Sequence, residues 1–487
     1  MELLWRWVND PLVRASAFDS APISWDAHRA WFEEKSSDAQ CLQYIAEDDG
    51  TPVGQVRFDR SDDASADVDV SVAPAARGRR YAARVLLLAS AALFRDADVE
   101  VVRARIKATN IASLTAFRAA GFQDGGRSHH AGSEIVTMTL SRLGWRGTAV
   151  FHADGGPGIG LGHAARCVGL AAAVAARGLR PLFLIDPASD IDGFIANYGF
   201  QRRTCVRRVE HLAEACTSVG AAALIVDSYR LSTAEMAELR SRVPVLVVFD
   251  DEDRADAPAD VVIDGSPAPT HSARASAAGT RYLRGTDFQV VRPEFVDVPS
   301  RRYAPVVRRI LVTVGGGDAL GLLQALQDFF ESRPALAPGA TVDVVVGPFA
   351  TAVRTPPGSR IRVVAKPPDL RPLMLDADVA ISGGGQTVYE MLRCATPLVA
   401  MCVGADQERQ LKAFAALDVL DYIGWAGTDG WLSRLETALI RLDRDSARRE
   451  RLGRAAARVI DGRGGHRIAG ELQEVLAASA TKSGRDA

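Results

Sequence analysis

The chain has 487 residues, which predicts roughly two to four domains, and its 47% hydrophobic and 24% charged residues are typical of a globular protein. Its 58 basic and 60 acidic residues nearly balance, and the longest apolar run, VLLLASAALF, is too short to span a bilayer, so neither nucleic acid nor a membrane is expected as a partner. The six scattered cysteines form no CxxC pair and have no histidine at metal-ligand spacing, which argues against disulfides and a zinc site and favours a reducing, cytoplasmic setting.

Strand-like and helix-like runs alternate along the chain, which predicts the α/β fold class. A polar stretch after EIVTMTL ends a first block, residues 1–145. The Pro- and Arg-rich VDVPSRRYAPVVRR then separates a second block, residues 148–297, from a third, residues 305–480.

The first block contains two strand-like runs, residues 53–60 and 67–74, followed by a turn and a long helix in ARGRRYAARVLLLASAALF. Such a turn directs backbone N–H groups and the positive end of a helix at one point, which suits a pyrophosphate. A second motif, NIASLTAFRAAGF, follows at residues 110–122.

Together these motifs resemble the GNAT acetyltransferases, and the opening LLWRWVNDPLVR resembles the subgroup that acetylates amino groups on nucleotide-linked sugars. The resemblance covers about residues 1–143 and implies a mixed sheet with helices and acetyl-CoA as co-substrate. The residues that it implies for the acetyl-CoA site are Val72, Arg77, Gly78, Arg79, Ala82, Asn110 and Ser113.

Two positions depart from the GNAT pattern. Arg80 replaces the usual second loop glycine, and its side chain obstructs a close approach of the backbone to phosphate, although an arginine can itself pair with phosphate. Phe117 stands where many relatives have the tyrosine that protonates the departing CoA thiolate. The first block is therefore either a working acetyltransferase or a folded domain that only binds or assembles.

The second block opens with the strand-like AVFHAD, a glycine-rich loop and a helix headed by His163. Ligands of open α/β sheets collect at the carboxyl ends of strands, where this loop lies. A histidine at a helix start can simply cap or pack. Alternatively, the positive helix end lowers its pKa and keeps the imidazole neutral, as a general base requires.

The third block repeats this arrangement in ILVTVGGGD and again in SGGGQTVYE, residues 382–390. A glycine loop that enters a helix places free N–H groups against a diphosphate. We therefore expect two successive Rossmann-like halves with a ligand between them.

The motifs GIGLGHAARCVGLA, LIVDSYRLS, YLRGTDFQVVRPEF and DADVAISGGGQTVYEMLRCATPLVAM resemble the UDP-sugar hydrolases of pseudaminic acid biosynthesis, over about residues 148–475. The resemblance implies a GT-B-like pair of Rossmann-like domains and inverting water attack on the anomeric carbon. His163 would be the base, Tyr229 would position the water or a sugar hydroxyl, and Glu390 would hold the ribose. The residues expected to bind the UDP-sugar are Gly160, Gly162, Arg166, Asp227, Gly315, Gly316, Gly384, Gly385, Gln386, Thr387, Glu390, Asp406 and Gln407.

Carboxylates raise two further points. Asp227, Asp250 and Asp251 follow apolar strands, where metal ligands could lie, but the family works without metal, so we interpret them as loop and helix-cap groups. Asp406 stands where relatives usually have asparagine, and its charge either assists His163 or indicates a different sugar.

Joined together, the blocks predict a bifunctional enzyme that acetylates the 4-amino group of a UDP-4-amino-4,6-dideoxy sugar and then releases UDP, giving 2,4-diacetamido-2,4,6-trideoxy-L-altrose. Its expected partners are this UDP-amino sugar and acetyl-CoA. Two alternatives remain open: a GT-B glycosyltransferase that uses a UDP-sugar, and a UDP-sugar hydrolase with a non-catalytic GNAT-like module.

Overall fold

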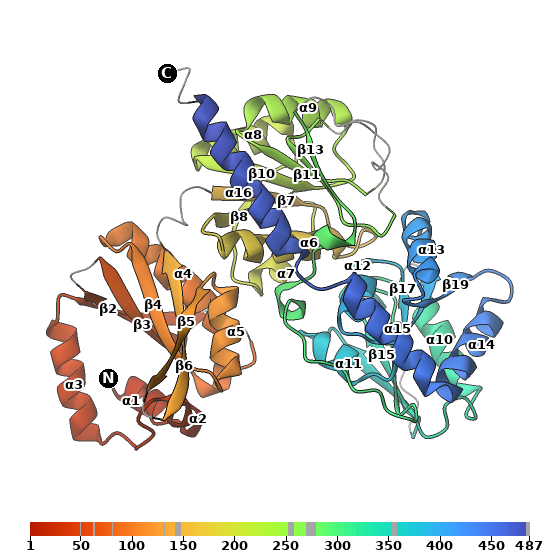
Figure 1. The fold of residues 1–487 in the computed structure, drawn as a ribbon, viewed down its shortest axis with the longest axis horizontal. Coiled ribbons are helices and arrows are strands. Elements are labelled where there is room, and N and C mark those ends of the chain that lie inside the picture. Colours follow the sequence, from red (N-terminus) through yellow and green to blue (C-terminus); the bar gives the residue numbers. More distant parts are fainter. Residues whose placement is uncertain are drawn as a thin grey trace. The chain divides into compact units, whose positions relative to one another are not determined.

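The computed structural model describes most of the chain, and the fold is built on three β-sheets (Figure 1). Arg80, one of the two departures from the GNAT pattern, lies outside the described residues. The described residues are 1–48, 50–61, 64–79, 81–130, 132–141, 148–251, 258–268, 279–318, 320–351 and 358–483.

The first sheet has six strands in the order β1-β2-β3-β4-β6-β5. Only β3 and β4 pair in parallel, and this pairing joins Ser65–Asp67 to Val101–Arg103, so the two strands diverge where β3 continues to Val72. The strands are β1 (Cys41–Asp48), β2 (Thr51–Ser61), β3 (Ser65–Val72), β4 (Val101–Lys107), β5 (Gln123–His130) and β6 (Ser133–Ser141).

Alternation along β4 sets the two faces of this sheet. Val102, Ala104 and Ile106 are buried, while Arg103 and Arg105 lie on the opposite face. The buried face packs against α4 and α5, whose apolar residues belong to the same core. The helices of this part are α1 (Glu2–Val8), α2 (Pro11–Ser16), α3 (Trp25–Ser37), the 3₁₀ turn η1 (Pro74–Ala76), α4 (Tyr81–Asp96) and α5 (Ile111–Ala119).

The second sheet has seven strands in the order β13-β12-β11-β10-β7-β8-β9. Read from β9, the strands follow the order 3-2-1-4-5-6 of a doubly wound sheet, with one further strand. The strands are β7 (Thr148–Ala153), β8 (Arg180–Ile185), β9 (Gln201–Thr204), β10 (Ala221–Asp227), β11 (Leu246–Phe249), β12 (Val261–Asp264) and β13 (Arg281–Arg284). Its helices are α6 (Gly162–Ala175), α7 (Asp192–Ala196), α8 (Val209–Ser218) and α9 (Thr233–Arg242).

The third sheet has six strands in the order β16-β15-β14-β17-β18-β19, which is again 3-2-1-4-5-6. The strands are β14 (Arg309–Thr313), β15 (Thr341–Val346), β16 (Ile361–Ala365), β17 (Val379–Gly383), β18 (Leu398–Cys402) and β19 (Asp421–Trp425). Its helices are α10 (Leu322–Glu331), α11 (Arg371–Asp376), α12 (Gln386–Arg393), α13 (Glu408–Ala416), α14 (Trp431–Arg444) and α15 (Ser446–Val459), with the 3₁₀ turn η6 (Ala405–Gln407).

A connecting segment and the last helix join the two doubly wound sheets. The 3₁₀ turns η4 (Thr286–Phe288) and η5 (Pro293–Phe295) lie on the connection, and α16 (Gly464–Ser483) contacts η4. The expectation of two successive Rossmann-like halves is confirmed, because both sheets have the doubly wound strand order. The domain boundaries drawn from the sequence stay predictions.

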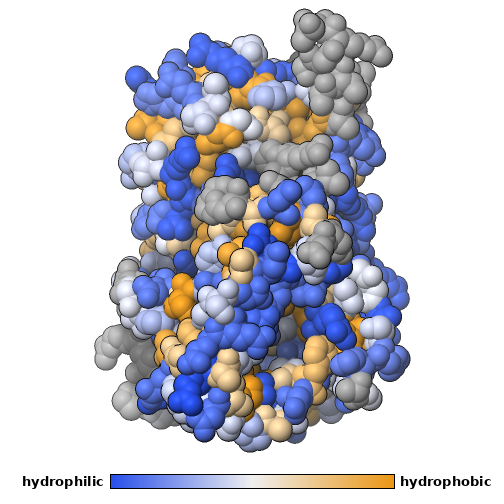
Figure 2. All heavy atoms as spheres, turned by 90° about the vertical axis from the view of Figure 1, so that its left-hand side faces the viewer, coloured by the Kyte–Doolittle hydropathy of each residue, from blue (hydrophilic) through white to orange (hydrophobic). Residues whose placement is uncertain are grey.

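One face of the molecule has a mixed surface. On the face that Figure 2 presents, small hydrophobic areas lie among hydrophilic residues. Across the described part of the chain, no helix has the length and apolar character needed to cross a membrane.

Candidate active site

The strand orders indicate where a ligand would lie. In a doubly wound sheet, ligands bind at the carboxyl ends of the strands where the order reverses, between the first and the fourth strand in sequence. In the second sheet these strands are β7 and β10, which lead into the His163 loop and into Tyr229. In the third sheet they are β14 and β17, which lead into two glycine loops.

The glycine loops of the two sheets touch. A Cβ added to Gly316 would lie 3.4 Å from the backbone nitrogen of Leu161, and one added to Gly162 would lie 3.7 Å from the Cβ of Gln386. The start of α6 therefore faces both the loop after β14 and the start of α12.

Three glycines give the loop after β7 its path. Gly156, Gly158 and Gly160 have φ values of +134°, +86° and +85°, which other residues rarely adopt. The N–H of Gly160 donates to the carbonyl of Gly156 at 2.8 Å, so the loop closes tightly before α6 begins.

The His163 ring is held by the carboxylate of Asp227. Its Nδ1 lies 2.6 Å from Oδ1 of Asp227, whose side chain is fully buried. Burial alone would raise the pKa of Asp227, but Arg166 and His163 outweigh it and lower the pKa to about 2. The ionised carboxylate makes Nδ1 the protonated nitrogen, so Nε2 carries the lone pair, and no hydrogen bond joins Nε2 to a described residue.

The expected lowering of the His163 pKa is wrong. Burial does disfavour the imidazolium, but the charge of Asp227 and its hydrogen bond outweigh burial and raise the pKa above its ordinary value. The helix end is the weaker influence, because a full carboxylate charge lies in contact with the ring.

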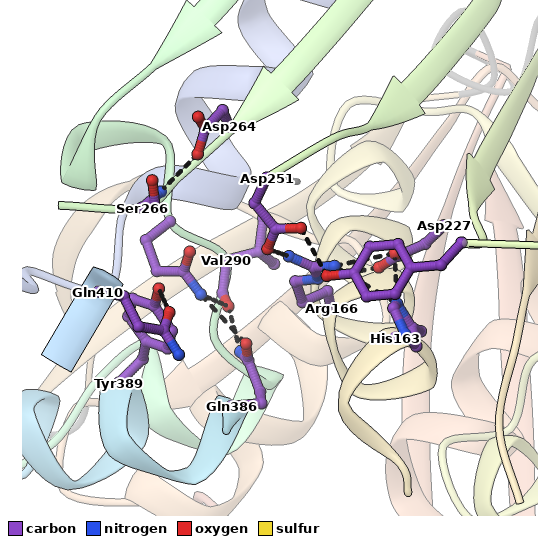
Figure 3. A network of polar contacts seen from close by, with 12 residues as sticks. His163, Arg166, Asp227, Asp251, Asp264, Ser266, Val290, Gln386, Tyr389 and Gln410 are labelled. Atoms are coloured by element: carbon purple, nitrogen blue, oxygen red, sulfur yellow. Dashed lines mark hydrogen bonds and ion pairs between the residues drawn. The ribbon is translucent and has the colours of Figure 1, made fainter. Parts of the chain in front are cut away.

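Arg166 joins this pair to a second one (Figure 3). Its Nε and Nη2 each lie 2.9 Å from an oxygen of Asp227, and its Nη1 lies 2.6 Å from Oδ2 of Asp251. The hydroxyl of Tyr229 donates to Oδ1 of Asp251 at 2.6 Å, and its ring meets the His163 ring edge-on with centroids 4.5 Å apart.

This network corrects the interpretation of two aspartates. Asp227 has no exposed surface, and its carboxylate is bonded to His163 and Arg166. Asp251 pairs with Arg166 and Tyr229. The expected contact of Asp227 with the UDP-sugar stays a prediction. Arg166, expected at the substrate, has its three nitrogens bonded to these two carboxylates.

Gly384 and Gly385 differ in what surrounds them. The N–H of Gly384 donates to Oε1 of Gln407 at 2.9 Å, and an added Cβ would lie 2.7 Å from the Cβ of Gln407. Gln407 thus fixes the loop and occupies the Gly384 N–H, and the expected phosphate contact of Gly384 stays a prediction. Gly385 caps α12, and an added Cβ there would meet no atom within 4 Å. The open end of α12 thus consists of Gly385, Gln386 and Thr387.

Two side chains of α12 bind the connecting segment. Nε2 of Gln386 donates to the carbonyl of Val290 at 2.6 Å. Arg292 makes two hydrogen bonds of 2.6 Å to the two oxygens of Glu390, which is buried. Burial raises the pKa of Glu390, and Arg292 opposes this rise. The ribose-binding role of Glu390 stays a prediction.

Asp406 lies in η6, beside Gln407. Burial and the charge of Asp251 raise the pKa of its carboxyl, and His163 opposes them. The side chain is thus within electrostatic range of the His163 network. Across the described residues, no cluster of three or more His, Cys, Asp or Glu side chains is arranged to hold a metal ion.

The residues expected to bind acetyl-CoA lie between β3 and α5. Val72 ends β3, Gly78 has a φ of +76°, and Arg77 pairs with Asp10 at 2.7 Å. Asn110 caps α5 by accepting from the N–H of Ser113 at 3.1 Å. Arg79 precedes α4, and Ala82 lies in its first turn.

The second departure from the GNAT pattern lies in the core of the first sheet. Phe117 is buried on α5 and meets Phe122 edge-on, with ring centroids 4.9 Å apart. The position thus offers packing, and no proton donor.

Residues 1–123 match the family model of the acetyltransferase (GNAT) domain. Among solved structures, the spinosyn forosaminyltransferase SpnP is 16% identical, covers 68% of this chain and 99% of its own, and has a TM-score of 0.50. The calicheamicin glycosyltransferase CalG4 is 15% identical with the same coverage and a TM-score of 0.49. The spermidine N-acetyltransferase from Vibrio cholerae, solved with CoA and spermine, is 13% identical, covers 29% of this chain and 89% of its own, and has a TM-score of 0.27. No curated protein matches the chain.

The chain therefore has a GNAT domain at its N-terminus, followed by a GT-B-like fold of the glycosyltransferase type. This confirms the predicted fold class. The likeness to SpnP concerns the fold alone.

Proposed function

We propose that this protein is a bifunctional nucleotide-sugar enzyme. Its GT-B-like part hydrolyses the bond between UDP and an amino sugar, and its GNAT domain acetylates that sugar with acetyl-CoA. The observation that carries the hydrolase proposal is the contact of His163 with the ionised Asp227 at the point where the strand order reverses. We expect a cytoplasmic enzyme.

In the hydrolysis, Nε2 of His163 takes a proton from water as the water oxygen bonds to the anomeric carbon. The bond from that carbon to the phosphate oxygen breaks, and its electron pair leaves with UDP. Attack on the side opposite to UDP inverts the anomeric carbon. The imidazolium that forms is stabilised by Asp227, which already accepts from Nδ1.

The leaving group would lie against the start of α12. The N–H groups of Gln386 and Thr387 and the positive end of the helix favour the growing charge on the diphosphate. Gly385 supports this assignment, because its surroundings leave open space where a phosphate would approach.

In the acetylation, the sugar amine bonds to the acetyl carbonyl carbon as the carbon–sulfur bond breaks, and CoA leaves as a thiolate. The divergence of β3 and β4 supports acetyl-CoA binding, since it leaves strand backbone available to a ligand beside the turn into α4. Phe117 has no proton to offer, so the proton that the amine nitrogen loses would reach the CoA thiolate through water.

The motifs quoted above narrow the proposal to a UDP-4-amino-4,6-dideoxy sugar of pseudaminic acid biosynthesis. The test incubates the full chain with candidate UDP-amino sugars, with and without acetyl-CoA, in heavy-oxygen water, and follows all products by mass. We expect an acetylated free sugar that carries the heavy oxygen. Heavy oxygen in UDP, or transfer of the sugar to an added alcohol without hydrolysis, would contradict the hydrolase and favour a different enzyme of this fold.

The same assay separates the two parts. The His163→Ala variant should still acetylate and should release UDP at least about 100-fold more slowly than the parent. If unaltered protein releases UDP from a supplied acetylated sugar but never consumes acetyl-CoA with any candidate, the first domain is a binding module.

A further inference from the structure

Arg166 lies where the polar network of the site converges. It follows His163 by one turn of α6, so both side chains leave the same face of the helix. Its guanidinium contacts Asp227 through two nitrogens and Asp251 through the third, and the side chain is 11% exposed. This arrangement requires an arginine, because its planar guanidinium has donors on three nitrogens, whereas a lysine ammonium cannot bond two carboxylates in this fixed geometry.

We propose that Arg166 is a positioning residue that acts through two carboxylates at once: through Asp227 it fixes His163, and through Asp251 it fixes Tyr229. This inference rests on the proposed hydrolysis and names the group that organises it. Arg166 itself would not touch the substrate.

The proton positions follow from the contacts. Asp227 accepts from Arg166 and from Nδ1 of His163, which leaves Nε2 as an acceptor. Tyr229 donates its only hydroxyl proton to Asp251, so toward any further group its oxygen can only accept. A water between the two rings would donate one hydrogen to Nε2 of His163 and the other to the Tyr229 oxygen. Its lone pair would then point away from both rings and toward the sugar.

The charges in the network also suit the reaction. While His163 is neutral, the single positive charge of Arg166 faces the two negative charges of Asp227 and Asp251. The proton that His163 gains in the reaction adds a second positive charge, which balances the second carboxylate. The charged and titratable groups that face His163 are Asp227 from β10, Tyr229 after it, Arg166 from α6, Asp251 after β11 and Asp406 from η6.

The test measures the pKa of the His163 imidazole by NMR titration of the full chain, with the His163→Gln variant used to assign its signal. In Arg166→Met, loss of the cation should raise the pKa by about one unit, because the nearby positive charge opposes protonation. In Arg166→Lys, which keeps the charge, the rise should be smaller. In Asp251→Asn, loss of a carboxylate should lower the pKa.

The matched control is Arg362→Met. Arg362 also binds a carboxylate through two nitrogens, at 2.7 and 2.9 Å from Asp343, but on β16 and away from the network. It should leave the His163 signal unchanged. If the role of Arg166 is purely structural, Arg166→Met should lower stability, and the His163 pKa should not shift in opposite directions in Arg166→Met and Asp251→Asn. That outcome would overturn the proposal. If Arg166→Met does not fold, an unchanged or raised pKa in Asp251→Asn overturns it.

The titration needs no substrate, so its outcome is separate from that of the hydrolase assay. If the signs are as expected and no UDP-sugar is hydrolysed, the proposed function fails while the coupling of Arg166 to His163 stands. Where hydrolysis is seen, the acid limb of kcat/KM should move with the measured pKa in each variant.

Discussion

Two glycine-rich turns into helices, one before α6 and one before α12, look alike in sequence and differ in construction. Before α6, glycines with positive φ shape the backbone, and the His163 side chain at the helix start is held by a buried carboxylate. Before α12, Gly385 has a φ of −78°, and Gly384 is needed for space against Gln407. The glycine run alone thus does not distinguish a loop that presents a side chain from one that presents backbone N–H groups.

Under the proposed function, the first turn carries the chemistry and the second binds the nucleotide. Because the two turns touch, both can serve one ligand, and each can be altered separately.

The largest expected effect is that of His163→Ala on UDP release. Loss of a general base lowers the rate by about 10²–10⁴-fold, while the affinity for UDP, measured by calorimetry, should stay nearly unchanged. If the variant retains more than about a hundredth of the parent rate, His163 is not the general base.

Acidification tests the same residue without a mutation. The pKa of His163 is raised by Asp227 above its ordinary value of 6.5, and only the neutral ring is a base. Hydrolysis should therefore fall about tenfold per pH unit below a midpoint that lies above 6.5. A kcat/KM profile that stays flat to well below that value would mean that the imidazole is not the base.

Gly384→Ala should destabilise the protein. Its Cβ would lie 2.7 Å from the Cβ of Gln407 and 2.8 Å from Cδ1 of Leu411, and such overpacking costs about 1–3 kcal/mol. The loss is measured as the free energy of unfolding in urea. Unchanged stability would show that this loop can move aside.

Gly385→Ala is the matched substitution one residue later. Its surroundings are open, so stability should be unchanged, and the methyl group should weaken UDP binding several-fold by crowding the phosphate. Calorimetry with UDP gives the affinity. Equal affinities for UDP in parent and variant would mean that the diphosphate does not bind at the start of α12.

The smallest effect concerns Phe117 on α5 of the GNAT domain. Phe117→Tyr should leave acetylation unchanged or make it faster, because a tyrosine there restores the proton donor that GNAT relatives carry. Acetyl-CoA consumption measures the rate. A clear decrease would show that the buried ring serves packing against Phe122 and that this domain does not use an acid at that position.

Much of the fold follows from local patterns in the sequence. Buried parallel strands are continuous apolar runs, and glycines mark the turns at their carboxyl ends, so the two Rossmann-like halves and the place of His163 could be predicted. The carboxylate partner of His163 could not, because Asp227 lies 64 residues further along the chain and only the fold of the sheet brings it to the ring. The sign of the His163 pKa failed for the same reason: the helix end is visible in the sequence, and the carboxylate beneath the ring is not.

The Arg292–Glu390 pair has an evolutionary consequence. Both side chains are buried, so replacing either one alone would strand a charge at a cost of about 3–5 kcal/mol. Homologous chains should then keep both residues or lose both together, so an arginine and a glutamate that covary at these two positions would mark chains that share this contact between α12 and the connecting segment.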